Sequence, residues 1–354
     1  MVCIAAFILL CALSVFVGVL SIFYRPVGKK YWKTFKKAWG CVWKKVRLQK
    51  CETGFKDDIK NSILAKVVVK KPKLVKPISI GIEITAVLIV FVTVWSLATA
   101  AKSGLALFVY GTCNVSQPSS CSLDASEACT IDSNKEFGFF GSIGNWFVEF
   151  GEVVMAVPTR LKHWDATQYL PDNYSYYKRT EGNPVALDIL DPGCLVCRES
   201  FKRQLESGFF DRYNVALLLY PISDDEAESG YKFQNSYVIV RYLEAVRGYK
   251  GDGSTEWRMI ERIFVESDER GRQYQDAFNG TYGQDEAERR LKDWLREWGY
   301  EEKDIEAIAK LAASDHVADV IAKTKETVEN EIKTKKIPTI IYDGRRHDGL
   351  FEAK

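Results

Sequence analysis

The chain has 354 residues, enough for about two average domains. With 47% hydrophobic and 27% charged residues it has the composition of a globular protein, which excludes an intrinsically disordered chain. The net charge of +2 is unevenly distributed, because residues 25–77 hold 17 Lys and Arg against three Asp and Glu. No repeat with a period of about 20–50 residues is present, which excludes a solenoid.

Two apolar segments are long enough to cross a bilayer, which takes about 20 residues. The first covers residues 1–24, and the second covers residues 78–101 between Lys76 and Lys102. A cleaved signal peptide is the alternative for the first segment. We disfavour it because the segment lacks a basic start and its apolar stretch exceeds the usual length of about 7–15 residues. The sequence therefore predicts two transmembrane helices.

The basic residues between these segments predict their orientation, because Lys and Arg concentrate in cytoplasmic loops. Residues 25–77 are therefore expected in the cytoplasm, with the N-terminus and all residues after 101 outside it. This two-pass arrangement favours a bacterial inner membrane or a single-membrane envelope as the localisation. It also places the C-terminal part of the chain in an oxidising compartment, where disulfides persist.

The basic loop contains a predicted amphipathic helix in "KKYWKTFKKAWGCVWKKV", residues 29–46. Aromatic residues recur at every fourth position, so a helix gathers them along one side among the lysines: Tyr31, Phe35, Trp39 and Trp43. Such a face suits binding to anionic membrane lipid. Basic runs with aromatic residues also bind nucleic acid, but next to a membrane span we favour lipid and expect no nucleic-acid partner.

Residues 102–183 are predicted to be an extracytoplasmic linker region that contains cysteines. The stretch "GTCNVSQPSSCSLDASEACT" holds Cys113, Cys121 and Cys129 among turn-forming residues. Two of the three could form a structural disulfide, in a pairing that the sequence does not specify, or all three could stay free. The apolar, glycine-rich stretch at 137–158 fits either an interfacial helix or a segment that packs against the outer domain.

From residue 184 the pattern of strands and helices becomes regular. Short apolar strands are predicted at 185–190 and 214–221, with a helix over "LVCRESFKRQLESG" (195–208) between them. A strand at 339–342 is followed by the turn Asp343-Gly344 and a return strand. Between the second and third strands lies a predicted helical insertion at about 222–336, with helices near 233–248, 255–268, 284–298, 302–313 and 315–333.

Cys194 and Cys197 form a CxxC motif at the start of the predicted helix at 195–208. Unpaired N–H groups and the positive end of the helix dipole stabilise a thiolate there, so Cys194 is the predicted nucleophile. Cys197 lies one turn later, where it can resolve a mixed disulfide. Two inert buried thiols are one alternative. Zinc is another, but it needs four ligands, and His163, His316 and His347 have no ligand spacing. We expect no metal and no other cofactor.

The stretches "LDILDPGCLVCRESF" and "ENEIKTKKIPTIIYDGRRHDG" together resemble the thioredoxin-like proteins of the DsbA type, which are exported thiol–disulfide oxidoreductases. The order of strand, CxxC helix, strand, helical insertion and Pro-Thr strand also matches. The resemblance implies an α/β thioredoxin-like domain at 184–354, preceded here by the two transmembrane helices. It also implies that Pro338 is cis and lies beside the active cysteines, so that Ile337, Pro338 and Thr339 bind the substrate chain.

We therefore predict a membrane-tethered thiol–disulfide oxidoreductase with a redox-active Cys194–Cys197 disulfide. Its expected partners are cysteine-containing exported proteins, membrane lipid and a redox partner that resets the pair. Oxidation is the default direction of the family, while Leu195-Val196 between the cysteines leaves reduction or isomerisation open. The alternative is a non-catalytic scaffold of a cell-envelope or secretion assembly, in which the thioredoxin-like domain is a binding module.

Overall fold

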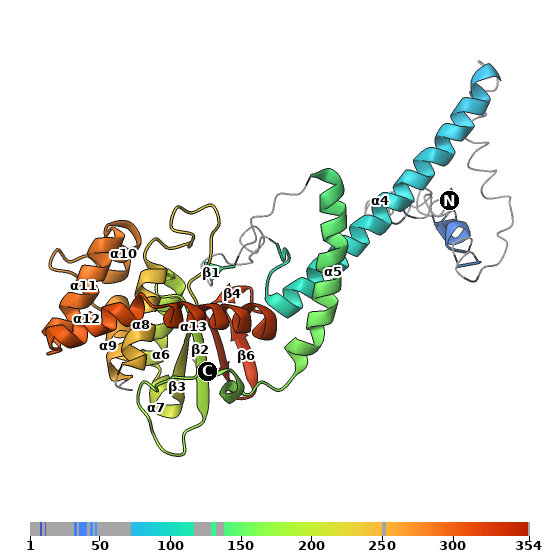
Figure 1. Ribbon diagram of the computed structural model, residues 1–354. Helices are drawn as coiled ribbons and strands as arrows, with labels where there is room; N and C mark the ends of the chain where they lie inside the picture. Colours follow the sequence, from blue (N-terminus) through green and yellow to red (C-terminus); the bar gives the residue numbers. More distant parts are fainter. Residues whose placement is uncertain are drawn as a thin grey trace. The chain divides into compact units, whose positions relative to one another are not determined.

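The computed structural model describes residues 72–116, 129–131, 138–249 and 253–352, together with scattered positions among the first 47 residues. Figure 1 shows the order of the elements along the chain, and the chain divides into two compact units, residues 1–101 and 102–354. Of the predicted transmembrane helix at 1–24 only residues 8 and 11 are described, and most of the predicted cytoplasmic loop lies outside the described residues. In the predicted amphipathic helix, positions 32–33, 35–40 and 43–44 are described, and they are helical.

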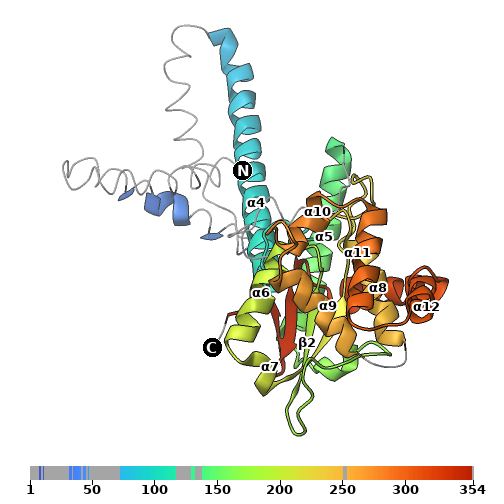
Figure 2. The ribbon, with the colours of Figure 1, turned by 90° about the vertical axis from the view of Figure 1, so that its left-hand side faces the viewer.

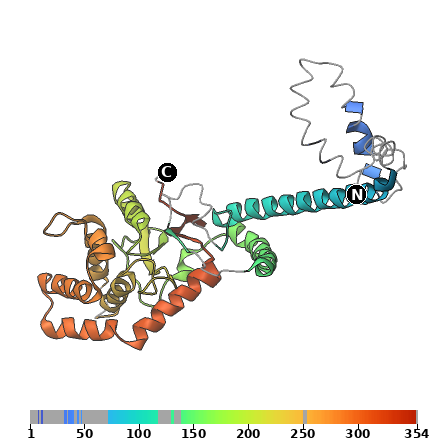
Figure 3. The ribbon, with the colours of Figure 1, turned by 90° about the horizontal axis from the view of Figure 1, so that it is seen from above.

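Among the described residues, one helix is long and apolar enough to cross a membrane. It is α4 (Val75–Tyr110), which follows the short 3-10 helix η1 (Pro72–Leu74). Figure 3 shows α4 as a single continuous helix. Apolar side chains along it, such as Phe91 and Leu97, are exposed, as a lipid-facing surface requires. The predicted span at 78–101 lies within α4, but the helix continues beyond it to Tyr110.

The region predicted to be a linker contains packed helices. Inside the second unit, the end of α4 packs against α5 (Phe139–Leu161). Lys102 of α4 forms a buried ion pair with Glu149 of α5, and the Asn145 amide donates to the same carboxylate at 2.9 Å. Most of the apolar stretch at 137–158 thus belongs to a helix that packs within this unit. Both helices contribute buried apolar side chains: Ala106, Val109, Tyr110, Val153 and Ala156.

The described part of the second unit contains a four-stranded mixed sheet in the order β3-β2-β5-β6. In the middle of the sheet, β2 pairs in parallel with β3 and antiparallel with β5, and β6 pairs antiparallel with β5. The resemblance implies the order of these strands along the chain, and the structure adds their directions. The strands are β2 (Val185–Leu190), β3 (Asn214–Leu219), β5 (Thr339–Tyr342) and β6 (Arg345–Asp348).

Every residue of β3, and every residue of β2 after the first, is buried. Such continuous apolar runs form strands that are covered on both faces. Leu187 of β2 and Ile341 of β5 are directly opposite each other, and both are fully buried in the same core as Phe201. The core of the unit therefore lies against the central strands.

Helices α6 (Leu195–Glu206) and α7 (Phe209–Arg212) connect β2 to β3. Figure 2 shows α6 beside β2, and α6 also packs against α9 (Ser254–Val265), because the rings of Phe201 and Phe264 have centroids 5.6 Å apart. The seven residues of α10 were not predicted, because they are too few to show a helical period. Where the sequence predicts the insertion, before β4 (Lys336–Ile337), the structure has α8 (Ser236–Gly248), α9 (Ser254–Val265), α10 (Tyr274–Gly280), α11 (Gln284–Glu297), α12 (Glu302–Ala312), α13 (Asp315–Glu326) and the π-helix η4 (Thr327–Ile332).

A buried arginine on β6 joins the sheet to two other segments. Arg346 is only 3% exposed. Its guanidinium donates to the carbonyl oxygens of Ile332 at 2.6 Å and Val109 at 2.9 Å, and it also donates to Asp348 at 3.1 Å. The Arg346 side chain thus connects the end of η4 and the end of α4 to the edge strand β6 through hydrogen bonds.

The turn between β5 and β6 requires a glycine. Gly344 has a φ of 72°, and an added Cβ would lie 2.2 Å from the His163 ring. We expect Gly344→Ala to lower the free energy of unfolding by about 1–2 kcal/mol, because L-residues are disfavoured in this left-handed conformation. Gly182→Ala is the matched control, with a φ of 87° but open space around the new Cβ. Urea denaturation of both variants separates the backbone effect from the His163 contact, and no loss for Gly344→Ala contradicts the prediction.

Candidate redox site

The CxxC motif begins α6, directly after β2 and a short turn. Cys194 is the N-cap residue of α6, with extended φ and ψ of −76° and 121°. The Gly193 N–H donates to Asp191 Oδ1 at 2.8 Å, which fixes the turn before it. Because the first N–H groups of a helix have no intrahelical partner, the positive end of the helix dipole is at Cys194. Cys197 lies one turn further along α6, and both cysteines are buried.

In the structure, Cys194 forms a disulfide with Cys129. Their Cα atoms are 6.2 Å apart, and 65 residues separate them in the sequence. Cys197 is a free, buried thiol, so the predicted Cys194–Cys197 disulfide is not formed in this state. Cys129 therefore takes no part in a structural disulfide with Cys113 or Cys121, and a pairing between those two cysteines stays a prediction. Cys113 is disulfide-bonded, and Cys121 lies outside the described residues.

A short strand explains why Cys129 reaches Cys194. The strand β1 (Cys129–Thr130) pairs antiparallel with β4, with Cys129 opposite Ile337 and Thr130 opposite Lys336. β4 immediately precedes Pro338, which lies near the start of α6 in space. The backbone pairing therefore holds the Cys129 sulfur next to Cys194, whereas Cys197 lies one turn deeper.

Of the three residues predicted to bind substrate, Ile337 lies beside Cys194. The Ile337–Pro338 peptide bond is cis, as the resemblance implies. The Cys194 sulfur lies 3.7 Å from the carbonyl oxygen of Ile337. Thr339 belongs to β5, where its backbone is paired with β2 and β6 and its side chain is fully buried. The edge that accepts another strand is therefore β4, which includes Ile337 but not Thr339.

Two buried carboxyl groups surround the inner cysteine. Asp188 of β2 accepts a hydrogen bond from Gln204 at 2.8 Å, and burial raises its pKa to about 7. Asp191 accepts the N–H of Ile222 at 2.7 Å, and burial raises its pKa to about 6. Burial also raises the pKa of the Cys197 thiol well above its usual value. A backbone hydrogen bond from Asp191 lowers this pKa, whereas the charges of the two carboxylates raise it further. Cys197 is therefore a protonated thiol at neutral pH.

Neither acid is among the predicted site residues. One signal for Asp188 was present, because it is the only charged residue in the apolar run "VALDIL". A charged residue in a buried strand needs a partner or a function. Its second oxygen, Oδ1, has no hydrogen-bond partner among the described residues, which leaves it available for a proton.

The helical insertion supports the CxxC turn through α10. Gln275 is fully buried, and its amide donates to the carbonyl oxygens of Pro192 at 2.8 Å and Cys194 at 2.9 Å. The Asn279 amide donates to the carbonyl oxygen of Gly193 at 2.7 Å. Three consecutive carbonyl groups of the turn thus have donors on one short helix. Because α10 itself was not predicted, these contacts could not be predicted from the sequence.

We expect Gln275→Leu to lower the free energy of unfolding by about 2 kcal/mol, because two buried carbonyl groups lose their donor. Gln284→Leu is the control, since Gln284 is an exposed residue at the start of α11, and its replacement should change stability by less than about 0.5 kcal/mol. Urea denaturation followed by tryptophan fluorescence measures both. Equal effects of the two substitutions would show that α10 does not brace the turn.

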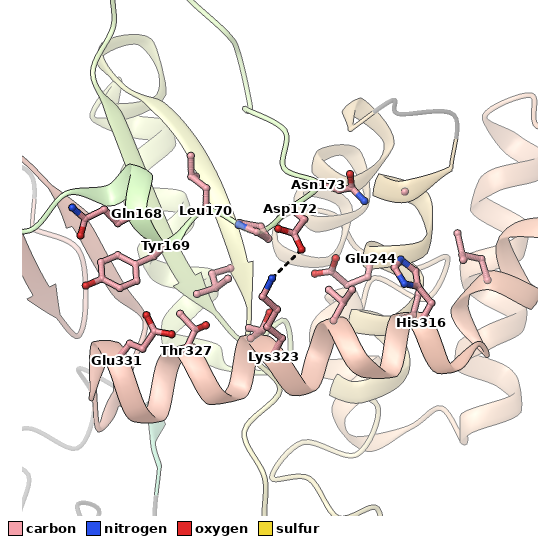
Figure 4. Close-up of a pocket in the computed structure, with 17 residues that line it drawn as sticks. Gln168, Tyr169, Leu170, Asp172, Asn173, Glu244, His316, Lys323, Thr327 and Glu331 are labelled. Atoms are coloured by element: carbon pink, nitrogen blue, oxygen red, sulfur yellow. Dashed lines mark hydrogen bonds and ion pairs between the residues drawn. The ribbon is translucent and has the colours of Figure 1, made fainter.

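A separate cavity of about 420 Å³ lies between α13 and the chain at 168–173, and no cysteine lines it. Figure 4 shows Tyr169, Leu170 and Asp172 on one side and Lys323 on the other. Lys323 and Asp172 form an ion pair of 3.0 Å across it. This cavity therefore contributes no thiol to the group of cysteines at the start of α6.

Comparison with known proteins found similarity only among solved structures: no protein-family model and no curated protein matches the chain. The thiol-disulfide exchange protein alpha-DsbA2 from Wolbachia pipientis is 15% identical over 53% of this chain and 88% of its own, with a TM-score of 0.36. MdbA, a thiol-disulfide oxidoreductase from Corynebacterium diphtheriae, is 15% identical over 47% and 78%, with a TM-score of 0.35. The cytosolic disulfide reductase DsbM from Pseudomonas aeruginosa is 15% identical over 47% and 89%, with a TM-score of 0.32. The function is therefore inferred from the geometry of the cysteines.

Proposed function

We propose that the chain is a thiol–disulfide oxidoreductase in which Cys194 is the nucleophile and Cys197 is the resolving thiol. One observation carries the proposal. Cys194, at the N-cap of α6, is bonded to a cysteine outside the CxxC motif, while Cys197 remains a buried thiol one turn away. This is the arrangement of a mixed disulfide, the intermediate through which thiol–disulfide exchange proceeds.

In the direction of substrate oxidation, a substrate thiolate attacks the Cys194 sulfur of a Cys194–Cys197 disulfide. A new bond forms to Cys194, and Cys197 leaves as a thiolate, which takes up a proton. A second substrate thiolate then attacks the first substrate sulfur, and Cys194 leaves as a thiolate that the N-terminus of α6 stabilises. The substrate loses two electrons, and the CxxC pair gains them. Asp188, with a pKa of about 7, is a buried acid able to exchange the Cys197 proton near neutral pH.

The surroundings of Cys194 support a protein substrate. The edge of β4 binds an extended chain as an added strand, which uses backbone groups and so tolerates many sequences. Leu195, next to Cys194, is 48% exposed and offers an apolar contact. We further propose that the substrates are exported proteins, that two helices hold the domain outside the cytoplasm at a cell membrane, and that oxidation is the working direction. The apolar helix α4 supports the membrane tether.

The test is to equilibrate the full chain in detergent with glutathione buffers and to map the remaining thiols by alkylation. A reduction potential near about −120 mV for the Cys194–Cys197 pair identifies an oxidant, and one near about −270 mV identifies a reductant. A bond to Cys194 that persists below about −300 mV behaves as a structural disulfide and contradicts the proposal.

A non-catalytic scaffold is the second candidate. A permanent Cys129–Cys194 disulfide favours the scaffold, because such a bond only cross-links β1 to the start of α6. The same titration separates the two functions, since an enzyme exchanges this bond with glutathione and a scaffold keeps it.

A further inference from the structure

We propose that Cys129 is a third redox-active cysteine, and that residues 129–131 are an internal substrate. This segment occupies the position of a substrate chain until its bond to Cys194 is transferred to Cys197. The inference rests on the proposed function, because it needs Cys194 to exchange disulfides. It adds a regulating thiol from a part of the chain that lies 65 residues before the CxxC motif.

The segment makes the backbone contacts of a bound peptide. Cys129 and Thr130 form β1, which pairs antiparallel with β4 directly before the cis peptide bond. The next residue continues the pairing, since the Ile131 N–H donates to the carbonyl oxygen of Lys335 at 3.2 Å. An added strand on an exposed sheet edge is a general way of binding an extended peptide. Three consecutive residues are thus held as a substrate strand would be.

A lysine from outside both strands holds the same segment. Lys232, between β3 and α8, donates to the carbonyl oxygen of Thr130 at 3.0 Å and to its hydroxyl at 3.3 Å. The carbonyl contact does not depend on which side chain follows the cysteine. The site therefore suits extended cysteine-containing chains of varied sequence that run antiparallel to β4.

An external substrate and this segment exclude each other. Cys194 is 0% exposed, its sulfur is bonded to Cys129, and the β4 edge beside it is already paired. A substrate sulfur that attacks Cys194 in line needs the space that Cys129 fills. The segment must therefore leave before the proposed reaction begins.

Cys197 is the group placed to release the segment. Its thiol loses a proton, and its sulfur attacks the Cys194 sulfur. The Cys194–Cys197 bond forms as the Cys194–Cys129 bond breaks, and Cys129 leaves with the electron pair as a thiolate, which takes up a proton. One disulfide is exchanged for another, so the step needs no external oxidant or reductant. The product has an oxidised CxxC pair and a free Cys129 thiol.

The experiment uses the full chain in detergent, with a reduced peptide that carries two cysteines as the probe. Acid quenching, alkylation and peptide mapping identify the bond at Cys194 over time. The wild type is expected to show both the Cys129 and the Cys197 bond, and Cys197→Ser to show the Cys129 bond alone. Cys129→Ser is expected to oxidise the peptide with an initial rate about tenfold above the wild type, because a tethered competitor acts at an effective concentration in the millimolar range.

Cys113→Ser is the matched control, because it removes another disulfide-bonded cysteine from the region before α5. It should oxidise the peptide at the wild-type rate. A wild-type rate for Cys129→Ser would overturn the internal substrate and leave the proposed function standing. If neither the wild type nor Cys129→Ser oxidises the peptide, the proposed function itself fails.

Lys232→Met tests the same inference without removing a cysteine. It deletes the donor to the Thr130 carbonyl and should shift the bond at Cys194 from Cys129 toward Cys197 by severalfold in the ratio of mapped peptides. An unchanged ratio contradicts the inference. A wild-type chain that keeps only the Cys129 bond, even with excess peptide, shows that the bond is permanent and also overturns it.

Discussion

Replacing Cys194 by serine is expected to reduce thiol–disulfide exchange to the background rate of the reagents. The serine hydroxyl is not a nucleophile toward disulfide sulfur at neutral pH, and the N-terminus of α6 acts on the acidity of a thiol at this position. Cys197 does not replace it, because this thiol is buried and its pKa is raised well above the usual value. The rate is measured with a reduced dithiol peptide and the oxidised full chain.

Cys129→Ser is the control that makes this result specific. Both substitutions remove the same Cys129–Cys194 bond, so any effect of losing that bond on stability is shared between them. Only Cys194→Ser removes the nucleophile, and only this variant should lose activity. If both variants lose activity equally, the bond supports the fold of the site and Cys194 has no separate chemical role.

Asp188→Asn is expected to raise stability above neutral pH and to change it little near pH 4. The folded-state pKa of Asp188 is about 7, against 3.8 for an unperturbed aspartate. Between these values the unfolded chain is ionised at this group and the folded chain is not, so the stability of the wild type falls as the pH rises. Above pH 7 the loss is complete and amounts to about 4 kcal/mol. Asparagine does not ionise, so the variant lacks this loss.

The measurement is urea denaturation of the wild type and Asp188→Asn at pH 5, 6, 7 and 8. The difference between the two free energies of unfolding should grow in favour of the variant up to about pH 7–8 and then stay constant. Asp191 also has a raised pKa, of about 6, but it is present in both proteins and cancels in the difference. A difference that does not change with pH would mean that Asp188 is ionised in the folded state throughout.

Features set by short sequence patterns were predictable. The apolar runs at 185–190 and 214–221 form β2 and β3, because a continuous apolar run in a strand has to be buried on both faces. The turn at Asp343 and Gly344 has positive φ at both residues, as residues of this type allow in a tight hairpin. The cis bond before Pro338 follows from the resemblance of a few residues around it. In each case the cause lies within a few positions of the residue concerned.

Features that depend on distant contacts were not predictable. The partner of Cys129 is decided by strand pairing with β4, some 200 residues later in the chain, and cysteine spacing alone does not specify a pairing. The donors of Gln275 and Asn279 support the CxxC turn only because the insertion folds back over it. The burial of Asp188 is a property of the whole sheet, although its position in an apolar run was visible in the sequence.

The sequence distance between Cys129 and Cys194 has a thermodynamic consequence. A cross-link restricts the unfolded chain in proportion to the logarithm of the loop it closes, and closing 65 residues stabilises the folded state by about 4 kcal/mol in the chain-entropy model. Moving the bond to Cys197 closes only the small CxxC ring and releases most of that restriction. The form that we propose reacts with substrate is then also the less stable form. Heat and proteases would consequently act on the form with the Cys194–Cys197 bond before they act on the form with the Cys129–Cys194 bond.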